Sequence, residues 1–238
     1  MTHIRLFVPA ALAEGAPVEA TPAQAHYLGT VMRRSPGDPV RLFNGTDGEW
    51  EARIAAPGGG HGRGRLILLP ERLVRPRAAE PDLWLLFAPL KRDTTDLVVE
   101  KAVELGVSAL LPVTTERTNA GRINADRLRS IAIEAAEQCE RLTVPRIEPL
   151  RPLASVLDGW PADRPLFVAL ERDAAPPPPA LDRPAALLIG PEGGLGPRDR
   201  ALLSRLEAMV PVSLGPRILR AETAAIVGLA LLQRPSCG

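Results

Sequence analysis

The sequence predicts an α/β protein, in which a domain with a mostly parallel sheet and helices on both faces follows a small β-rich unit. From residue 83 onward, apolar runs that suit buried strands alternate with segments whose apolar residues recur at helical spacing. Before residue 80, short apolar runs flank turn signals instead. The Arg- and Pro-bearing segment Leu73–Pro81 separates the two patterns, so we place one domain at residues 1–76 and a second at 77–238.

The first domain is expected to contain a strand, one helix and then a meander of strands. Apolar residues between Thr21 and Arg34 recur at helical spacing, which predicts a helix capped by Thr21 with Pro22 in its first turn. The residues that define this helical face are Ala25, Leu28, Val31 and Met32. The strands of the meander are expected at Val40–Phe43, Trp50–Ile54 and Arg65–Leu69, the first two joined by an Asn-Gly turn. The glycine-rich residues 57–62 suit a loop.

The second domain is expected to alternate strands and helices. Leu83–Ala88 is a continuous apolar run that suits a strand buried on both faces, and Asp93–Leu105 has helical spacing and ends at Gly106. Further strands are expected at Ala109–Val113, Leu166–Leu170, Ala185–Ile189 and Val210–Leu214. Further helices are expected at Asn124–Gln138, Pro197–Glu207 and Ala221–Gln233. The proline-rich residues 174–179 interrupt this pattern and suit an extended surface connection.

The composition excludes several classes of protein. The 238 residues include 45% hydrophobic residues, enough for a core, so the chain is neither disordered nor collagen-like. The 29 Lys plus Arg nearly balance the 28 Asp plus Glu, so net charge alone does not indicate a nucleic-acid partner. No apolar run is long enough to span a bilayer, and the start lacks an export signal. With only two cysteines, the chain is expected to be soluble and cytoplasmic.

Ligands of an open α/β sheet bind at the carboxyl ends of its strands, which draws attention to the segments after Ile189 and Leu214. The first, GPEGGLGP, has no Lys-Ser/Thr after its glycines, and Glu192 places a carboxylate where a pyrophosphate needs positive potential. This segment therefore favours a ligand that carries a positive centre or neutral hydrogen-bonding edges and is approached by bare backbone.

The second segment, LGPRILRAETA, ends in the first turn of a helix that is apolar on nearly every side. Such a helix must be buried in the core or against another subunit. From residue types alone, Glu222 is either a functional group or an acid that complements the helix dipole, and Arg220 is either functional or a solvated loop cation. The histidines His3, His26 and His61 lack ligand spacing and neither cysteine belongs to a CxxC pair, so no metal site is expected.

Four blocks of the sequence together resemble one family. They are LKRDTTDLVVEKAVELGVSALLPVTTERT at 90–118, IEAAEQCERLTVPRI at 133–147, LLIGPEGGLG at 187–196 and LGPRILRAETAAIVGLALL at 214–232. The order and content of these blocks are similar to the RsmE family of 16S rRNA uridine N3-methyltransferases, members of the SPOUT class. The first domain adds Arg5 in IRLF and the run from His26 to Asp38, similar to the family's PUA-like RNA-binding β-barrel domain.

This resemblance implies a trefoil-knotted SPOUT domain that binds S-adenosylmethionine (SAM) and forms a homodimer, without metal or membrane. Nothing in the periodicity indicates a knot, which the general rules of chain topology disfavour. The residues that the resemblance assigns to the cofactor are Gly190, Glu192, Gly193, Gly194, Leu214, Gly215, Ile218, Leu219 and Thr223. The candidates for RNA contact are Arg5, His26, Arg33 and Arg34 in the first domain, together with Lys91 and Arg92, which follow the carboxyl end of a strand.

Methylation at N3 of uracil requires removal of a proton but no covalent adduct, so Cys139 is expected to be a small packing residue. A guanidinium can stabilise the anion that forms, and Arg220 is the first candidate. Glu222 either orients that arginine or takes the proton, and the sequence leaves both open. The expected substrate is 16S rRNA in the small ribosomal subunit. The alternatives are another SPOUT enzyme, which modifies a ribose 2′-hydroxyl or a tRNA guanine, and a non-catalytic assembly protein.

Overall fold

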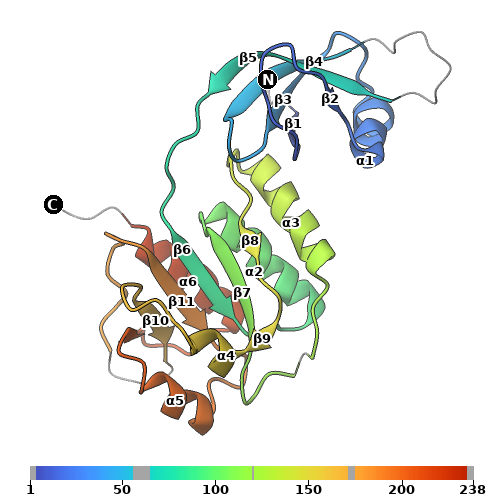
Figure 1. Cartoon of the computed structure of the whole chain (residues 1–238). Helices are drawn as coiled ribbons and strands as arrows, with labels where there is room; N and C mark the ends of the chain where they lie inside the picture. Colours follow the sequence, from blue (N-terminus) through green and yellow to red (C-terminus); the bar gives the residue numbers. More distant parts are fainter. Residues whose placement is uncertain (1–3, 56–64, 120, 171–174, 235–238) are drawn as a thin grey trace. The chain divides into compact units, whose positions relative to one another are not determined.

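The computed structural model describes residues 4–55, 65–119, 121–170 and 175–234. The chain divides into two compact units (Figure 1). The first unit contains residues 1–79 together with 136–144, and the second contains residues 80–135 and 145–238. This division lies three residues beyond the predicted boundary. The sequence did not predict that a later segment, residues 136–144, would group with the first unit.

The first unit is built around a five-stranded sheet with the order β1-β3-β4-β5-β2. Its strands are β1 (Arg5–Phe7), β2 (Val18–Glu19), β3 (Pro39–Phe43), β4 (Glu49–Ile54) and β5 (Ile67–Arg75). The predicted hairpin is confirmed, because β3 pairs antiparallel with β4. Its turn ends at Gly48, where φ is +82° and a Cβ atom would lie 2.5 Å from the carbonyl oxygen of Arg75, so only glycine fits.

The segment predicted as one helix forms two elements, α1 (Pro22–His26) and the π-helical turn η1 (Tyr27–Val31). The predicted cap is confirmed, because the Thr21 hydroxyl accepts a hydrogen bond from Gln24 N, and the side-chain oxygen of Gln24 accepts one from Thr21 N. The π-turn, with Met32 N donating to Tyr27 O at 2.9 Å, holds one more residue than an α-helical turn, so the residues after it leave the α-helical register. The predicted apolar face is therefore wrong, since Leu28 is buried but Val31 is 57% exposed.

The second unit contains a mostly parallel sheet, as predicted, and every pairing among its described strands is parallel. The order is β12-β10-β11-β6-β7-β8, with β9 also paired to β7. The strands are β6 (Leu83–Phe87), β7 (Ala109–Thr114), β8 (Arg146–Ile147), β9 (Arg151–Pro152), β10 (Leu166–Ala169), β11 (Ala185–Ile189) and β12 (Met209–Val212). Parallel pairing brings their carboxyl ends to one edge of the sheet.

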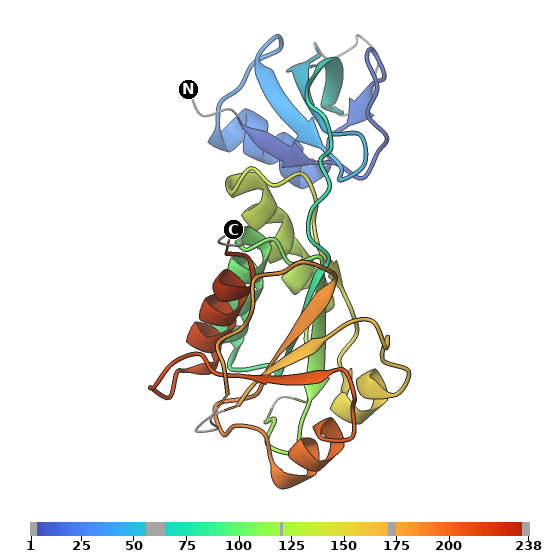
Figure 2. The same cartoon turned by 90° about the vertical axis from the view of Figure 1, so that its left-hand side faces the viewer.

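Helices cover both faces of this sheet (Figure 2). They are α2 (Arg92–Glu104), α3 (Ala125–Gln138), α4 (Leu153–Leu157), α5 (Pro197–Leu203) and α6 (Ala221–Leu232). Side chains of β11 alternate between the faces: Ala186 and Leu188 pack in one cluster with residues of α4 and α5, whereas Leu187 faces Gly228 of α6. Both sets are fully buried, which explains the continuous apolar runs in the sequence.

Two predicted loops lie outside the described residues in whole or in part. The glycine-rich residues 57–62 fall within the undescribed 56–64. Of the proline-rich connection, residues 175–180 are described and have no regular secondary structure, in agreement with the prediction. None of the helices in the described part of the chain has both the length and the apolar character required to cross a membrane.

A polar network near the amino end of β6 ties three segments of the second unit together. The carboxylate of Asp82 accepts hydrogen bonds from the Ser108 hydroxyl at 2.6 Å, from the Trp84 indole at 2.9 Å and from Arg164. Partial burial alone would raise the pKa of Asp82, but these donors lower it below its ordinary value of 3.8. The guanidinium of Arg164 also stacks 3.7 Å above the Trp84 ring.

Candidate functional site

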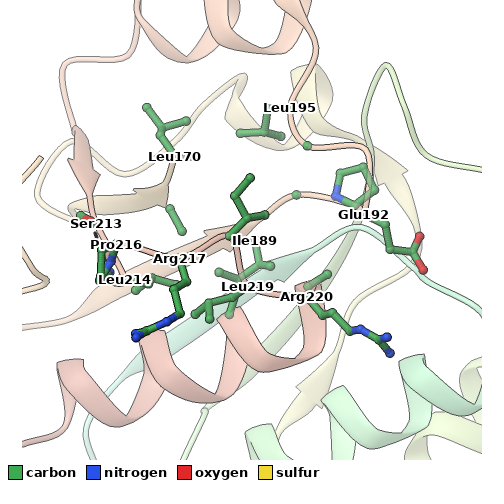
Figure 3. A pocket seen from close by; sticks show the side chains of 18 of the residues that line it. Leu170, Ile189, Glu192, Leu195, Ser213, Leu214, Pro216, Arg217, Leu219 and Arg220 are labelled. Carbon is green, nitrogen blue, oxygen red and sulfur yellow. Dashed lines mark hydrogen bonds between the residues drawn. The ribbon is translucent and has the colours of Figure 1, made fainter. Parts of the chain in front are cut away.

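A cavity of about 720 Å³ lies at the carboxyl ends of β10, β11 and β12, the position expected of a ligand site in this fold (Figure 3). Ala169 and Leu170 line it at the end of β10, and Ile189 lines it at the end of β11. Two further segments complete the walls, the glycine-rich loop after β11 and the arginine-containing loop between β12 and α6. Both segments are the ones that the sequence singled out.

The glycine-rich loop, residues 190–196, presents mostly backbone to the cavity. It turns tightly, because Gly194 N donates to Pro191 O at 2.8 Å and Gly194 has a φ of +69°. Leu195 then folds back over the start of the loop, so that a Cβ atom on Gly190 would lie 3.2 Å from its side chain. Leu195 thus occupies the space that a side chain at position 190 would need, so the start of the loop packs closely only with glycine there.

The second loop, residues 213–220, contributes charge as well as apolar surface. Gly215 has a φ of +117°, a conformation that other residues rarely adopt. Figure 3 shows the side chains of Arg217 and Arg220 extending to opposite sides of the cavity, while aliphatic side chains such as Ile189 occupy its middle. Arg220 immediately precedes the first residue of α6. The site thus combines an apolar centre with cations at its margin.

The structure brings together eight of the eleven residues that the sequence assigned to cofactor or catalysis. Those that line the cavity are Gly190, Glu192, Gly194, Leu214, Gly215, Ile218, Leu219 and Arg220. The lining does not include Gly193, Glu222 or Thr223. The carbonyl of Gly193 instead accepts a hydrogen bond from Arg117, and Thr223 is exposed. Glu222 is half-buried in the first turn of α6, beside Arg220 in the chain.

Several lining residues escaped the sequence analysis, notably Leu170, Leu195, Arg200 and Arg217. Leu170 could have been found, because it ends a predicted strand at the ligand-binding edge of the sheet. Arg217 lies in the second loop, which the sequence analysis had already singled out as a possible ligand-binding segment. Arg200 lies in α5, outside both loops that the sequence analysis singled out, and its Nε atom donates a long hydrogen bond to Leu195 O at 3.4 Å.

The structure places Arg5, one of the predicted RNA contacts, inside the first unit. Its guanidinium pairs with Glu49 and donates to the carbonyl oxygens of Ala136, Glu137 and Arg141 at 2.7, 2.8 and 2.9 Å. Its side chain is 7% exposed. A guanidinium enclosed in this way has no surface to offer a phosphate, so its position contradicts contact with RNA and indicates a structural role.

The other predicted RNA contacts are exposed. His26, Arg33 and Arg34 lie on and after the α1–η1 segment of the first unit, and Lys91 and Arg92 lie at the start of α2 in the second. In the described part of the chain, no three His, Cys, Asp or Glu side chains gather in a way that could hold a metal ion. Cys139 is a half-buried free thiol and does not line the cavity.

Comparison with known proteins first identifies the class of protein to which this chain belongs. Residues 78–233 match the family model of the RNA methyltransferase domain, and residues 20–67 match that of the RNA methyltransferase PUA domain. The cavity at the carboxyl ends of the strands falls within the first match. The protein is an RNA methyltransferase with an N-terminal PUA domain.

Within this class, the chain belongs to the ribosomal RNA small subunit methyltransferase E (RsmE) family, which confirms the resemblance inferred from its motifs. It is 34% identical to the Rickettsia conorii member over 97% of this chain and 95% of the relative. It is 31% identical to the Synechocystis member, over 90% of this chain and 72% of the relative.

Two solved structures agree with this assignment. The ribosomal RNA small subunit methyltransferase E of Neisseria gonorrhoeae, bound to S-adenosyl methionine, superimposes with a TM-score of 0.82 at 27% identity and covers 98% of this chain and 97% of its own. A methyltransferase from Legionella pneumophila in complex with SAM has a TM-score of 0.81 at 29% identity, with 98% of both chains covered.

Proposed function

We propose that this protein transfers the methyl group of SAM to N3 of a uridine in 16S rRNA of the small ribosomal subunit. The observation that carries the proposal is the cavity at the strand ends, walled by one glycine-rich and one arginine-containing loop, in a chain of the RsmE family. Relatives of this chain are named ribosomal RNA small subunit methyltransferase E, and two structural neighbours were solved with SAM.

The residues around the cavity fit such a cofactor. A volume of about 720 Å³ suits a ligand of nucleoside size, and the two lining glycines, Gly190 and Gly194, contribute only backbone atoms to its wall. Aliphatic side chains at the centre suit an adenine ring. The residues proposed to hold SAM are Gly190, Glu192, Gly193, Gly194, Leu214, Gly215, Ile218, Leu219 and Thr223. When bound, SAM supplies an electrophilic methyl group on a sulfonium centre.

The chain's own residues must then favour loss of the proton from uracil N3. Arg220 stands at the margin of the cavity, where its guanidinium can stabilise the negative charge that spreads over N3 and the flanking carbonyl oxygens. Glu222 follows two residues later, in the first turn of α6. It either accepts the proton or orients the guanidinium of Arg220. The target base has to leave its stack to enter, at a cost of a few kcal/mol that RNA contacts elsewhere offset.

The first unit supports the RNA-binding part of the proposal. Tyr27, which is 39% exposed, and Met32, which is 38% exposed, accompany the exposed His26, Arg33 and Arg34 on one short segment. Single-stranded RNA is bound by such combinations, because aromatic rings stack on bases while arginines contact phosphates. In the second unit, Lys91 and Arg92 offer further positive charge at the edge of the sheet where the cavity opens.

A homodimer, a trefoil knot and a cytoplasmic location complete the proposal. Support for the dimer comes from α6, which is apolar along its length and leaves Ile226 and Val227 half-buried. The knot is proposed from SPOUT class membership. The cytoplasmic location follows from the ribosomal substrate.

Mass spectrometry of nucleosides tests the chemistry. We expect 3-methyluridine in small-subunit rRNA treated with the wild-type protein and SAM, and none with Arg220→Ala. A methylated ribose or guanine in place of 3-methyluridine would assign the protein to another SPOUT activity. Calorimetry with S-adenosylhomocysteine (SAH) separates an enzyme from an assembly scaffold, because a scaffold should give no binding heat.

A further inference from the structure

The glycine-rich loop of the cavity requires an external restraint. Four of its seven residues, 190 to 196, are glycines, so the loop loses more conformational entropy on ordering than an average segment. Its own hydrogen bond from Gly194 N to Pro191 O fixes only one turn. A pocket that recognises its ligand through backbone groups needs those groups to be held in place before the ligand arrives.

A turn after β7 supplies such a restraint. The turn is rigid in itself, because the hydroxyl of Thr118 accepts a hydrogen bond from Thr115 N at 2.8 Å and Thr118 N donates to Thr115 O at 3.1 Å. Between these residues, Arg117 Nη1 donates to the carbonyl oxygen of Gly193 at 2.6 Å. The aliphatic stem of Arg117 also packs over Gly193, within 3.5 Å of where a Cβ atom would be.

Glu116 holds the other end of the loop. Its Oε2 atom accepts a hydrogen bond from Arg198 N at 3.0 Å, while its own backbone N–H donates to the Asp199 carboxylate. Asp199, itself buried, also accepts from Gly196 N at 3.0 Å. The carboxyl group of Glu116 lies so close to Gly196 that a Cβ atom there would be 2.3 Å from Oε2. The end of the loop is therefore clamped between two carboxylates.

We propose that Glu116 and Arg117 are positioning residues for cofactor binding, which act by clamping the glycine-rich loop at Gly196 and Gly193. Neither residue lines the cavity, so their effect on the cofactor passes through the loop backbone. The inference rests on the proposed function only in that it takes SAM as the ligand of this loop. A chain without the clamp still folds but presents the peptide groups of the loop in many conformations.

The test compares Arg117→Ala, Arg117→Lys, Glu116→Ala and Glu116→Gln in the full-length protein. We expect both alanine variants to weaken SAH binding by about tenfold in calorimetry and to raise the KM for SAM equally. The value of kcat at saturating SAM and the KM for RNA should stay within about twofold, since neither residue contacts the reacting atoms. The lysine and glutamine variants should recover most of the affinity, because each retains a suitable donor or acceptor.

Arg198→Ala is the matched control, because only the backbone of that exposed arginine takes part in the clamp. Hydrogen exchange of the peptide that covers residues 190–196 should become faster in the alanine variants and stay unchanged in the control. Unchanged SAH affinity in both alanine variants would overturn the proposal, as would a fall in kcat with SAH affinity intact. If the wild-type protein itself failed to bind SAH, the proposed function would be at fault instead.

Discussion

Replacement of Arg5 distinguishes the role expected from the sequence from the one that the structure indicates. The change Arg5→Met keeps an unbranched apolar stem but removes the guanidinium. It leaves Glu49, whose side chain is 11% exposed, without its closest partner, and removes one donor from each of three backbone carbonyl oxygens. It also removes a cation–π contact in which the guanidinium lies 4.5 Å from the centre of the Phe43 ring.

The loss in free energy of unfolding that Arg5→Met should cause can be worked out from these contacts. Removal of one partner from a buried ion pair costs about 3–5 kcal/mol, because the remaining charge has lost its water as well as its partner. Glu49 keeps Arg75, whose Nε atom lies 3.4 Å from Oε2, which moves the expected cost to the lower end. We therefore expect a loss of about 3 kcal/mol, which is a large part of the 5–15 kcal/mol that stabilises a typical domain.

Hydrogen exchange measures this loss where it occurs. Peptides that cover β1 and β3 should exchange faster in Arg5→Met, while those that cover β6 and β11 should be unaffected. Arg34 is exposed and serves as the control for an arginine that contacts RNA. Arg34→Met should weaken RNA binding and leave the hydrogen-exchange rates of these peptides unchanged. If Arg5→Met lowered RNA affinity without any change in exchange, Arg5 would be an RNA contact and our structural argument would be refuted.

Three further predictions concern RNA, pH and the cofactor. Tyr27→Ala should weaken RNA binding by about 1–3 kcal/mol in filter binding at constant salt, as expected for loss of one stacked base, and equal affinity would exclude stacking. The pKa of Asp82 is lower in the folded protein than in the unfolded chain, so its ionised carboxylate stabilises the fold, and this stabilisation is lost when the group is protonated in acid. The free energy of unfolding should therefore fall as the pH drops below about 4, and urea titrations of Asp82→Asn should show a weaker dependence of stability on pH. Gly190→Ala should push Leu195 into the cavity and weaken SAH binding about tenfold in calorimetry, whereas Gly121→Ala, with no atom within 4 Å, should not.

The sequence predicted the second unit well because its strands are buried on both faces. A continuous apolar run located β11 at the observed residues, and helical spacing located α2 to within one residue at each end. Elements that are too short for a periodicity escaped notice, such as β8 and β9 with two residues each and α4 with five. The π-helical turn was missed for another reason, since helical spacing assumes a constant rotation per residue.

The site was predictable where its residues are consecutive and unpredictable where distant segments meet. Both loops of the cavity follow apolar strands, so the rule about carboxyl ends located them without a structure. The three backbone carbonyls to which Arg5 donates lie more than 130 residues away along the chain, and no local pattern indicates them. The same holds for Glu116 and Arg117, which are a charged pair between threonines in the sequence. Arg117 contacts the glycine-rich loop 76 residues further on, and Glu116 contacts the start of α5 83 residues further on.

The charges that line the cavity indicate which part of the reaction they serve. Three arginines, Arg200, Arg217 and Arg220, line it with one glutamate, Glu192, which is exposed. A site selected only to attract a cationic sulfonium would carry the opposite excess. In the proposed reaction, the positive excess would instead favour a polyanionic RNA and would lower the energy of the negative charge that develops on the base when it loses a proton. Cofactor recognition then falls mainly to backbone groups and aliphatic side chains, which explains why the geometry of the glycine-rich loop has to be so tightly held.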